Sequence, residues 1–388
     1  MPSRPEVKEK WITDMSKFIT VHVLNALPLH NLNRDQNGLP KSQFDGGIQR
    51  GRLSAQSRKR AARVAFRDMG HDDSIRTRQG VEETLKLAVA YATAEGIPFD
   101  EAAGKKAIKK VIDNLCKSEK KTDEKRAAAE KTETEVKDSD NIIFVSRAEL
   151  STLAVATVVS QQDHKSPEDS DIVADSSSPS LDIAAFGRMF ANSPVRGTHA
   201  AIAVSHANTT HQMTLTADYF SAVEDIEQEH AGAAHIGLSY YTTGVYYSSF
   251  TIDTAQLRRS WSAFGCEGAQ ETFGDLIKAL VRALPSGKAT NSNPYTTPAL
   301  VLVETQAFRT AYEFETPVVA DEEGGFKQGS VEALAEQRQQ ALAFDPSNFG
   351  PASVLGNTFG ADFEARRADN LDGIVDFVTA ATFGTTAQ

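Results

Sequence analysis

The order of strand-type and helix-type segments is the feature that most constrains how this chain can fold. The segment FITVHVLNAL, from Phe18, is rich in β-forming residues and predicts a first strand that ends at Pro28. A polar loop follows, whose Asn-Gly, Leu-Pro and Gly-Gly pairs favour irregular structure. Ser54 can then cap a helix that ends near Gly70.

Strand character returns in the second half of the chain. It is seen in LDIAAFGRMF, from Leu181, and again in HAAIAVSHANTTHQMTL, TTGVYYSSFTID and PALVLVET. Between the last two, ETFGDLIKALVRAL has a helical period and ends before Pro285. The order strand, helix, several strands, helix, strand predicts an α+β fold of the split βαβ type found in ferredoxin-like and RRM domains.

A large insertion separates the two halves of this pattern. Residues 76–115 have helical character, and residues 117–140 are mixed-charge and poor in apolar residues, which is typical of a solvated helix or a mobile insertion. The segment from Ser166, SPEDSDIVADSSSPSLD, reads as a linker.

Composition excludes several classes of protein. The chain has 388 residues, enough for one large folded unit or several modest ones, and its two cysteines, Cys116 and Cys266, form no CxxC pair. A disulfide framework is therefore not expected, and a reducing cytoplasm fits best. We expect no exported or membrane-spanning protein, because the first residues lack an apolar signal core and no run is long enough to cross a bilayer.

One stretch departs from the acidic character of the whole. Residues 50–67, RGRLSAQSRKRAARVAFR, hold seven Arg and Lys residues and no acid, in a chain whose formal net charge is −11. On the predicted helix, Ala62, Phe66 and their apolar neighbours share one sector, whereas Gln56, Lys59, Arg60, Arg63 and Arg67 share the next. The helix can thus lie on a sheet and present a row of cations beside an N-terminus that itself favours anions.

Two interpretations of these cations stay open from the residues alone. A charge run is most often a solvated face. Here, however, the charge has one sign and one sector, and the preceding loop adds the donors of Asn33, Arg34, Lys41, Arg50 and Arg52. Binding of a nucleic-acid backbone is about as well supported as the solvated face.

Other sites have weaker support. His206 and His211 are five residues apart in HANTTH, which places them on opposite faces of a strand, and no HExxH motif is present. Packing or hydrogen bonding is the commoner fate of such histidines, so we expect no metal site and no cofactor. No GxSxG motif links the Ser, His and Asp residues, and no Walker loop is present, so we expect no enzyme.

Several motifs, in one order, carry a family resemblance. They are LNRD at Leu32, FDGG at Phe44, RLSAQSRKRAAR from Arg52, DIAAFGRM from Asp182, AIAVSHANTTHQ from Ala201, DYFSAVED, GAAHIG and TGVYY. Together they resemble the backbone subunit of type I-E CRISPR Cascade complexes, often called CasC, of the RAMP superfamily. The stretch after Gly70, the charged insertion and the region after Gly324 match poorly.

The resemblance implies an RRM-like palm, inserted helical fingers and a β-hairpin thumb. The implied parts are a tail (1–15), a first palm segment (16–75), the fingers (76–180), a second palm segment (181–310) with the thumb at about 213–243, and a C-terminal extension packing on the palm (311–388). The implied RNA contacts are Arg34, Lys41, Ser54, Gln56, Ser57, Lys59, Arg60, Arg63, Arg188 and Met189, with Phe220 and Ser221 as the thumb wedge.

The resemblance also implies a function in antiviral defence. Copies of the chain would stack along CRISPR RNA into a helical filament, kink it at intervals, and leave the guide bases free to pair with target DNA. The implied partners are CRISPR RNA, target DNA through the guide, further copies of the chain, the large, small, five-prime cap and processing subunits of Cascade and, indirectly, the helicase-nuclease, with no membrane. We expect a non-catalytic subunit; the alternatives are an RRM-fold endoribonuclease that processes CRISPR RNA and an RNA chaperone that does not oligomerise.

Overall fold

The computed structural model describes residues 17–116, 142–173, 175–222 and 235–384. The predicted tail and the charged stretch 117–140 lie outside these residues. The chain forms two compact units: the first comprises Met1–Phe66, Ala203–Thr254 and Phe273–Gln388, and the second comprises Arg67–Ile202 and Ala255–Thr272. Among the residues described, no helix is both long and apolar enough to cross a membrane.

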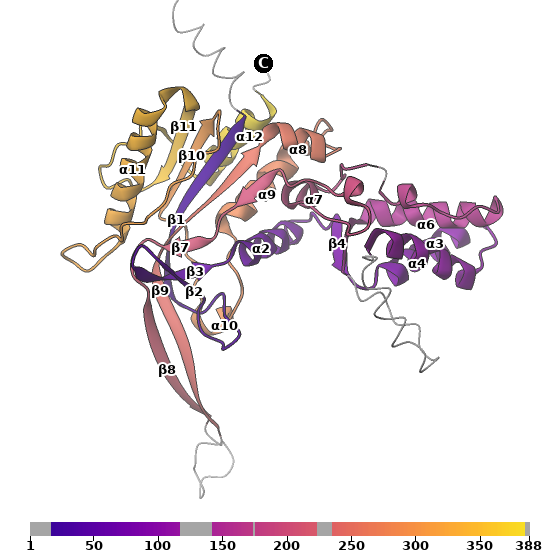
Figure 1. Cartoon of the computed structure of the whole chain (residues 1–388), viewed down its shortest axis with the longest axis horizontal. Coiled ribbons are helices and arrows are strands. Elements are labelled where there is room, and N and C mark those ends of the chain that lie inside the picture. Colours follow the sequence, from indigo (N-terminus) through magenta and orange to yellow (C-terminus); the bar gives the residue numbers. More distant parts are fainter. Residues whose placement is uncertain (1–16, 117–141, 174, 223–234, 385–388) are drawn as a thin grey trace, which may run out of the picture. The chain divides into compact units, whose positions relative to one another are not determined.

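A ten-stranded mixed sheet forms the core of the first unit (Figure 1). Its strands are β1 Phe18–His30, β2 Ser42–Asp45, β3 Ile48–Leu53, β6 Ile202–Val204, β7 Ala207–Thr209, β8 Thr214–Ala222, β9 His235–Asp253, β10 Leu300–Gln306, β11 Phe349–Gly356 and β12 Arg366–Arg367. The helices along this part of the chain are α2 Ala55–Asp68, α9 Ala269–Arg282, α10 Ala289–Ser292, α11 Lys327–Phe344 and α12 Leu371–Phe383, with the short turn η4 Pro346–Asn348.

The predicted RRM-like topology is confirmed by the strand order. Strand β1 lies between β10 and β9, and β7 lies beside β9, all as antiparallel neighbours. In chain order β1 leads to α2, then β7 and β9, then α9 and β10, so the central sheet has the split βαβ arrangement expected from the sequence. Strands β2 and β3 extend one edge of the sheet, and β11 and β12 extend the other.

The side chains on both faces of β1 are largely buried. Its apolar side chains include Ile19 and Val21, neither of which is exposed. The other face carries His22 and Leu24. Leu24 packs in a cluster with Val331 and Leu334 of α11, so the C-terminal region covers this face of the palm.

A buried polar network holds the covered face together. His22 Nε2 lies 3.0 Å from Glu304 Oε2, and Nε of Arg338, on α11, donates to Glu304 Oε1 at 2.8 Å. The hydroxyl of Tyr312 donates to the same carboxylate at 2.9 Å. Burial alone would raise the pKa of Glu304, but the hydrogen bond from His22 and the charges of His22 and Arg338 hold this pKa below its usual value. Removing one partner would leave a charge buried without compensation.

The second unit is mainly helical. Its elements are β4 Ser74–Thr77, α3 Gly80–Glu95, α4 Glu101–Cys116, β5 Ile143–Ser146, α6 Arg147–Gln162, η2 Asp169–Asp171, α7 Leu181–Phe186, η3 Pro194–Arg196 and α8 Thr254–Ser260. Its core joins apolar residues of α4 and α6 with Ile172 and Val173, so the segment predicted to be a linker contributes buried side chains.

Two local expectations were wrong. The segment from Leu181 is a helix, α7, whose residues Leu181–Ala185 are all buried, so its apolar run cannot be distinguished from a strand by periodicity. The loop after the first strand is only partly irregular, because β2 and β3 form a hairpin in it. Gly46 and Gly47 form its two-residue turn with φ of +57° and +75°, the backbone that favours glycine.

Candidate nucleic-acid interface

Helix α2 buries two residues of the apolar sector that the sequence predicted. Ala62 and Phe66 are its buried residues, while Gln56 and Arg60 are exposed and Lys59 and Arg63 are half-buried. The helix has no acidic residue in its first turn. The cations of α2 therefore follow a first turn that contains no carboxylate.

The start of α2 is held by side chains from two other segments. The Ser54 hydroxyl accepts a hydrogen bond from the Ser57 amide at 3.3 Å, which confirms Ser54 as the cap. The Ser54 amide donates to Asn33 Oδ1 at 2.9 Å. The Ala55 amide donates to Nδ1 of His206, which lies just before β7, at 2.9 Å. The helix N-terminus is thus fixed in place relative to the loop and to the sheet.

His206 marks the point at which several cations converge. Burial, followed by the charges of Arg52, Arg58 and Lys41, lowers the pKa of His206 below its ordinary value of 6.5. The ring is therefore neutral at pH 7 and can accept the hydrogen bond from the helix. These three cations therefore act on the ring that accepts a hydrogen bond from the N-terminus of α2.

The loop before the hairpin presents its cations from a hydrogen-bonded frame. The Lys41 amide donates to the Asn33 carbonyl at 2.8 Å, and the Arg52 amide donates to the Lys41 carbonyl at 2.8 Å. Arg34 forms an isolated bridge with Pro40, and its side chain is exposed. Arg34 and Lys41 thus lie on a defined backbone beside the start of α2.

Like charges are close together farther along α2. Burial and the neighbouring Arg63 lower the pKa of Lys59. Lys59 and Arg63 are four residues apart, a spacing at which like charges destabilise a helix. A polyanion lying along α2 would relieve this repulsion.

Arg50 and Arg58 have structural roles that the sequence did not reveal. The Arg50 side chain is buried, with its guanidinium on backbone carbonyls that include Thr209 at 2.8 Å and Glu315 at 3.1 Å. Arg58 donates to the Ser205 carbonyl at 2.7 Å. Neither role has a local signal, because the acceptors are main-chain atoms far away in the sequence.

The thumb residues lie on the two-stranded ribbon formed by β8 and the first part of β9. This ribbon extends away from the sheet of the first unit (Figure 1). Phe220 is 44% exposed and pairs with Gly237, where an added Cβ atom would collide with the Phe220 ring. The ring thus rests on the glycine backbone. Ser221 is exposed and pairs with Ile236. Residues 223–234 lie outside the described chain.

Lys288 and Asn31 hold the base of this ribbon. The Lys288 Nζ atom donates to the Ser239 hydroxyl at 2.8 Å and lies 5.5 Å from the centroid of the Tyr241 ring. The Asn31 amide donates to the Tyr240 carbonyl at 2.9 Å. The ribbon is therefore fixed where it leaves the sheet.

Arg188 and Met189 belong to the second unit, and the structure separates their roles. The Arg188 side chain is 1% exposed and forms a bidentate salt bridge with Glu149, at 2.6 and 2.7 Å. Glu149 completes the capping box at the start of α6. The Arg188 guanidinium is thus buried against a carboxylate of the second unit, and its contact with RNA stays a prediction. Met189, by contrast, is 84% exposed.

His206 and His211 are used as hydrogen-bonding residues. The buried His211 accepts from the Val245 amide through Nε2 at 3.1 Å, and its ring stacks on Phe326 with centroids 3.7 Å apart. Within the described residues, no group of three or more His, Cys, Asp or Glu could hold a metal ion.

Comparison with known proteins gives the family. The CT1975-like protein family model matches residues 19–372, so the chain belongs to the CT1975-like family. No curated protein matches it.

Among solved structures, two similar chains come from complexes described as "CRISPR RNA-guided surveillance complex, pre-nicking" and "CRISPR RNA-guided surveillance complex". The first has a TM-score of 0.74 and 21% identity, covering 94% of this chain and 100% of its own. The second has a TM-score of 0.67 and 19% identity, covering 94% and 99%. The protein therefore has the fold of these chains.

Proposed function

We propose that this protein is the RNA-binding backbone subunit of a CRISPR RNA-guided surveillance complex of the Cascade type. The observation that carries the proposal is the cationic surface at α2, formed by Lys41, Arg52, Lys59, Arg60 and Arg63. Phosphates are the ligands that a surface rich in Arg and Lys suits best. Membership of the CT1975-like family and a fold shared with chains of RNA-guided surveillance complexes support the same assignment.

The proposed interface holds the guide by its backbone. Lys41, Lys59, Arg60 and Arg63 neutralise phosphates, with Arg34 farther along the loop. Gln56 and Ser57 lie at the start of α2, where side-chain amides and hydroxyls can reach ribose 2′-hydroxyl groups. A guide must accept any spacer, so a subunit that contacts phosphate and sugar leaves the base edges unread.

The projecting ribbon is the proposed thumb. Phe220 offers an apolar ring near its outer part, and an aromatic ring between bases interrupts their stack. If the ribbon reaches the RNA held by the next copy, the contact is heterologous and repeats along the RNA. In this proposal the protein is a type I-E backbone subunit without catalytic activity. Its copies form a filament along the guide RNA, and the guide RNA pairs with target DNA. In the same proposal, the exposed apolar side chain of Met189, in the second unit, contacts the RNA.

Binding of purified full-length protein to labelled single-stranded RNA tests this function. We expect equal affinity for RNAs of unrelated sequence and a steep loss of affinity with salt, because phosphate contacts release counterions and carry no base information. A wide spread of affinities among sequences, or no RNA binding, would contradict the proposal. Incubation with CRISPR repeat RNA tests the enzymatic alternative: we expect intact RNA, whereas metal-independent cleavage would favour the endoribonuclease.

A further inference from the structure

The hairpin of β2 and β3 presents an aromatic ring that the proposed backbone interface does not use. Phe44 is 79% exposed, although an aromatic ring of this size is usually buried. It pairs across the hairpin with Gln49, two residues before the Gly46–Gly47 turn. Its position at the end of a short polar hairpin requires an explanation other than core packing.

The hairpin is firmly anchored, so the ring is held by a preorganised support. The guanidinium of Arg50, on β3, donates to the carbonyls of Asp45, Thr209, Phe314 and Glu315. Gly46 lies so close to the Glu315 carbonyl that a Cβ atom would collide with it.

Strand β3 is also tied to the base of the ribbon. The Gln49 carbonyl accepts a hydrogen bond from the Met213 amide, immediately before β8, at 2.8 Å. A ligand on Phe44 would therefore bind without the entropic cost of ordering a mobile loop.

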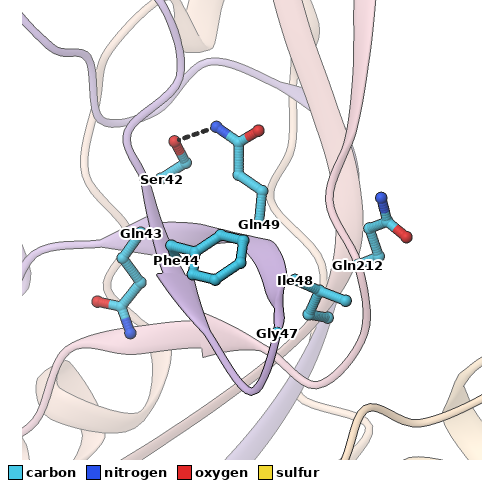
Figure 2. A pocket seen from close by; sticks show the side chains of 7 residues that line it. All are labelled: Ser42, Gln43, Phe44, Gly47, Ile48, Gln49 and Gln212. Carbon is cyan, nitrogen blue, oxygen red and sulfur yellow. Dashed lines mark hydrogen bonds between the residues drawn. The ribbon is translucent and has the colours of Figure 1, made fainter.

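The depression beside Phe44 is lined by uncharged residues, both polar and apolar. The ring borders an open depression of about 590 Å³. Figure 2 shows the residues that line it: Ser42, Gln43, Phe44, Gly47, Ile48, Gln49 and Gln212. The Gln49 side-chain amide donates to the Ser42 hydroxyl at 2.8 Å. An aromatic face beside amides and a hydroxyl matches a nucleobase, which has a flat π face and polar edges.

The same hairpin leads directly to the cations. Lys41 precedes β2, and the carbonyl of Lys41 accepts a hydrogen bond from the amide of Arg52, on β3, at 2.8 Å. Phe44 is three positions after Lys41 along extended chain, a path of roughly 10 Å. This odd spacing directs the side chains of Lys41 and Phe44 to opposite faces of the hairpin, so a single strand that passes over the hairpin edge could place a phosphate near Lys41 and Arg52 and a base on Phe44.

We propose that Phe44 is a stacking platform for an unpaired base of the nucleic acid bound along α2. The proposal rests on the proposed function, because it needs a single strand at the cationic surface. The base is contacted by its face and not by a matched set of donors and acceptors, so the platform is tolerant of sequence. The observations favour a base over a protein partner, because one ring and one isoleucine among three glutamines and a serine lack the extended apolar core typical of protein interfaces.

The platform is tested with three variants of the full-length protein: Phe44→Ala, Phe44→Tyr and Phe44→Trp. Binding is measured to labelled single-stranded RNA, to single-stranded DNA of the same sequence, and to an abasic strand. Phe44→Ala should weaken binding by about 5- to 140-fold per stacked base, while Tyr and Trp should restore it. The abasic strand should bind Phe44→Ala and the wild-type protein equally. The salt slope should not change, because no phosphate contact is removed.

Phe308→Ala is the matched control, since Phe308 is also in the first unit and is 72% exposed. It should bind like the wild-type protein. A loss restricted to RNA assigns the base to the guide, and a loss with both strands shows that the ring accepts DNA bases as well; both support stacking. Unchanged binding of Phe44→Ala to RNA and DNA overturns the platform, as does a loss of self-association in Phe44→Ala without nucleic acid, which would indicate a protein interface.

The failure of this inference is distinguishable from the failure of the proposed function. Normal binding of Phe44→Ala together with loss of binding in Lys59→Ala would overturn only the platform. Absence of RNA binding by the wild-type protein would overturn both.

Discussion

Replacing Lys59, Arg60 and Arg63 together by alanine should reduce the salt dependence of RNA binding by a defined amount. Each phosphate contact to a single strand contributes about 0.7 to the slope of log affinity against log salt, so three contacts contribute about two. When the salt concentration is lowered from 200 to 50 mM, the affinity of both proteins should rise, and the rise for the wild-type protein should be roughly 20 times larger than the rise for the variant.

The substitution should leave the fold of α2 intact. The buried residues of the helix, Ala62 and Phe66, are not changed. Alanine has the highest helix propensity, and removal of the like-charge pair Lys59 and Arg63 should stabilise the helix by about 0.2–0.5 kcal/mol. Thermal unfolding should therefore give an equal or slightly higher midpoint, which separates loss of binding from loss of folding.

The assay is fluorescence anisotropy with one labelled RNA over a series of salt concentrations. The matched control replaces three exposed cations elsewhere in the first unit, Arg282, Lys327 and Arg366, by alanine, which changes the net charge equally. The control should retain the wild-type slope. If the control and the α2 variant lose the same slope, binding follows net charge and the assignment of α2 as the interface is refuted.

Three further predictions concern other parts of the molecule. Phe220→Ala should lose roughly 1–3 kcal/mol of stacking per site while the salt slope persists; an unchanged affinity for long RNA would remove Phe220 from the interface. Glu304→Gln should lower the free energy of unfolding by about 3–5 kcal/mol, because it leaves Arg338 buried without its counter-charge; denaturant unfolding measures this, and a loss below about 1 kcal/mol would contradict the importance of the network. Burial lowers the pKa of His30 from 6.5 to about 4. As the pH falls, the unfolded chain therefore binds the proton before the folded chain does. The free energy of unfolding should decrease by up to about 3 kcal/mol between pH 6.5 and pH 4. A His30→Asn variant should show a smaller loss over this range, and an equal loss would refute the contribution of His30.

The central topology was predictable because it depends on local patterns read in order. The β-forming residues from Phe18 and the helical period of α2 and α9 identify elements, and the split βαβ order then specifies their neighbours. The apolar sector of α2 likewise identified its buried residues, Ala62 and Phe66, and placed Lys59, Arg60 and Arg63 outside the buried sector. These features need only the spacing of residues within one element.

Features that depend on distant partners were not predictable. Arg188 resembles a phosphate ligand in the sequence, but Glu149, 39 residues away, neutralises it in the fold. Arg50 lies in a basic run, yet its guanidinium also donates to the carbonyls of Thr209 and Glu315, far away in the sequence. No periodicity encodes such pairs, because they arise only when separate segments pack together. The β2–β3 hairpin did have a signal, the Gly-Gly pair between two short runs, but its polar residues masked the strand pattern.

The most direct test of the central claim is the mass of the particle formed when the protein, with the other Cascade subunits, is co-expressed with CRISPR RNAs of different spacer lengths. Native mass spectrometry measures this mass. A subunit that lines the guide should enter the particle in numbers that rise with spacer length, so the mass should increase in steps of one protomer as the spacer is extended. A particle whose protomer number stays constant while its RNA lengthens would contradict the account.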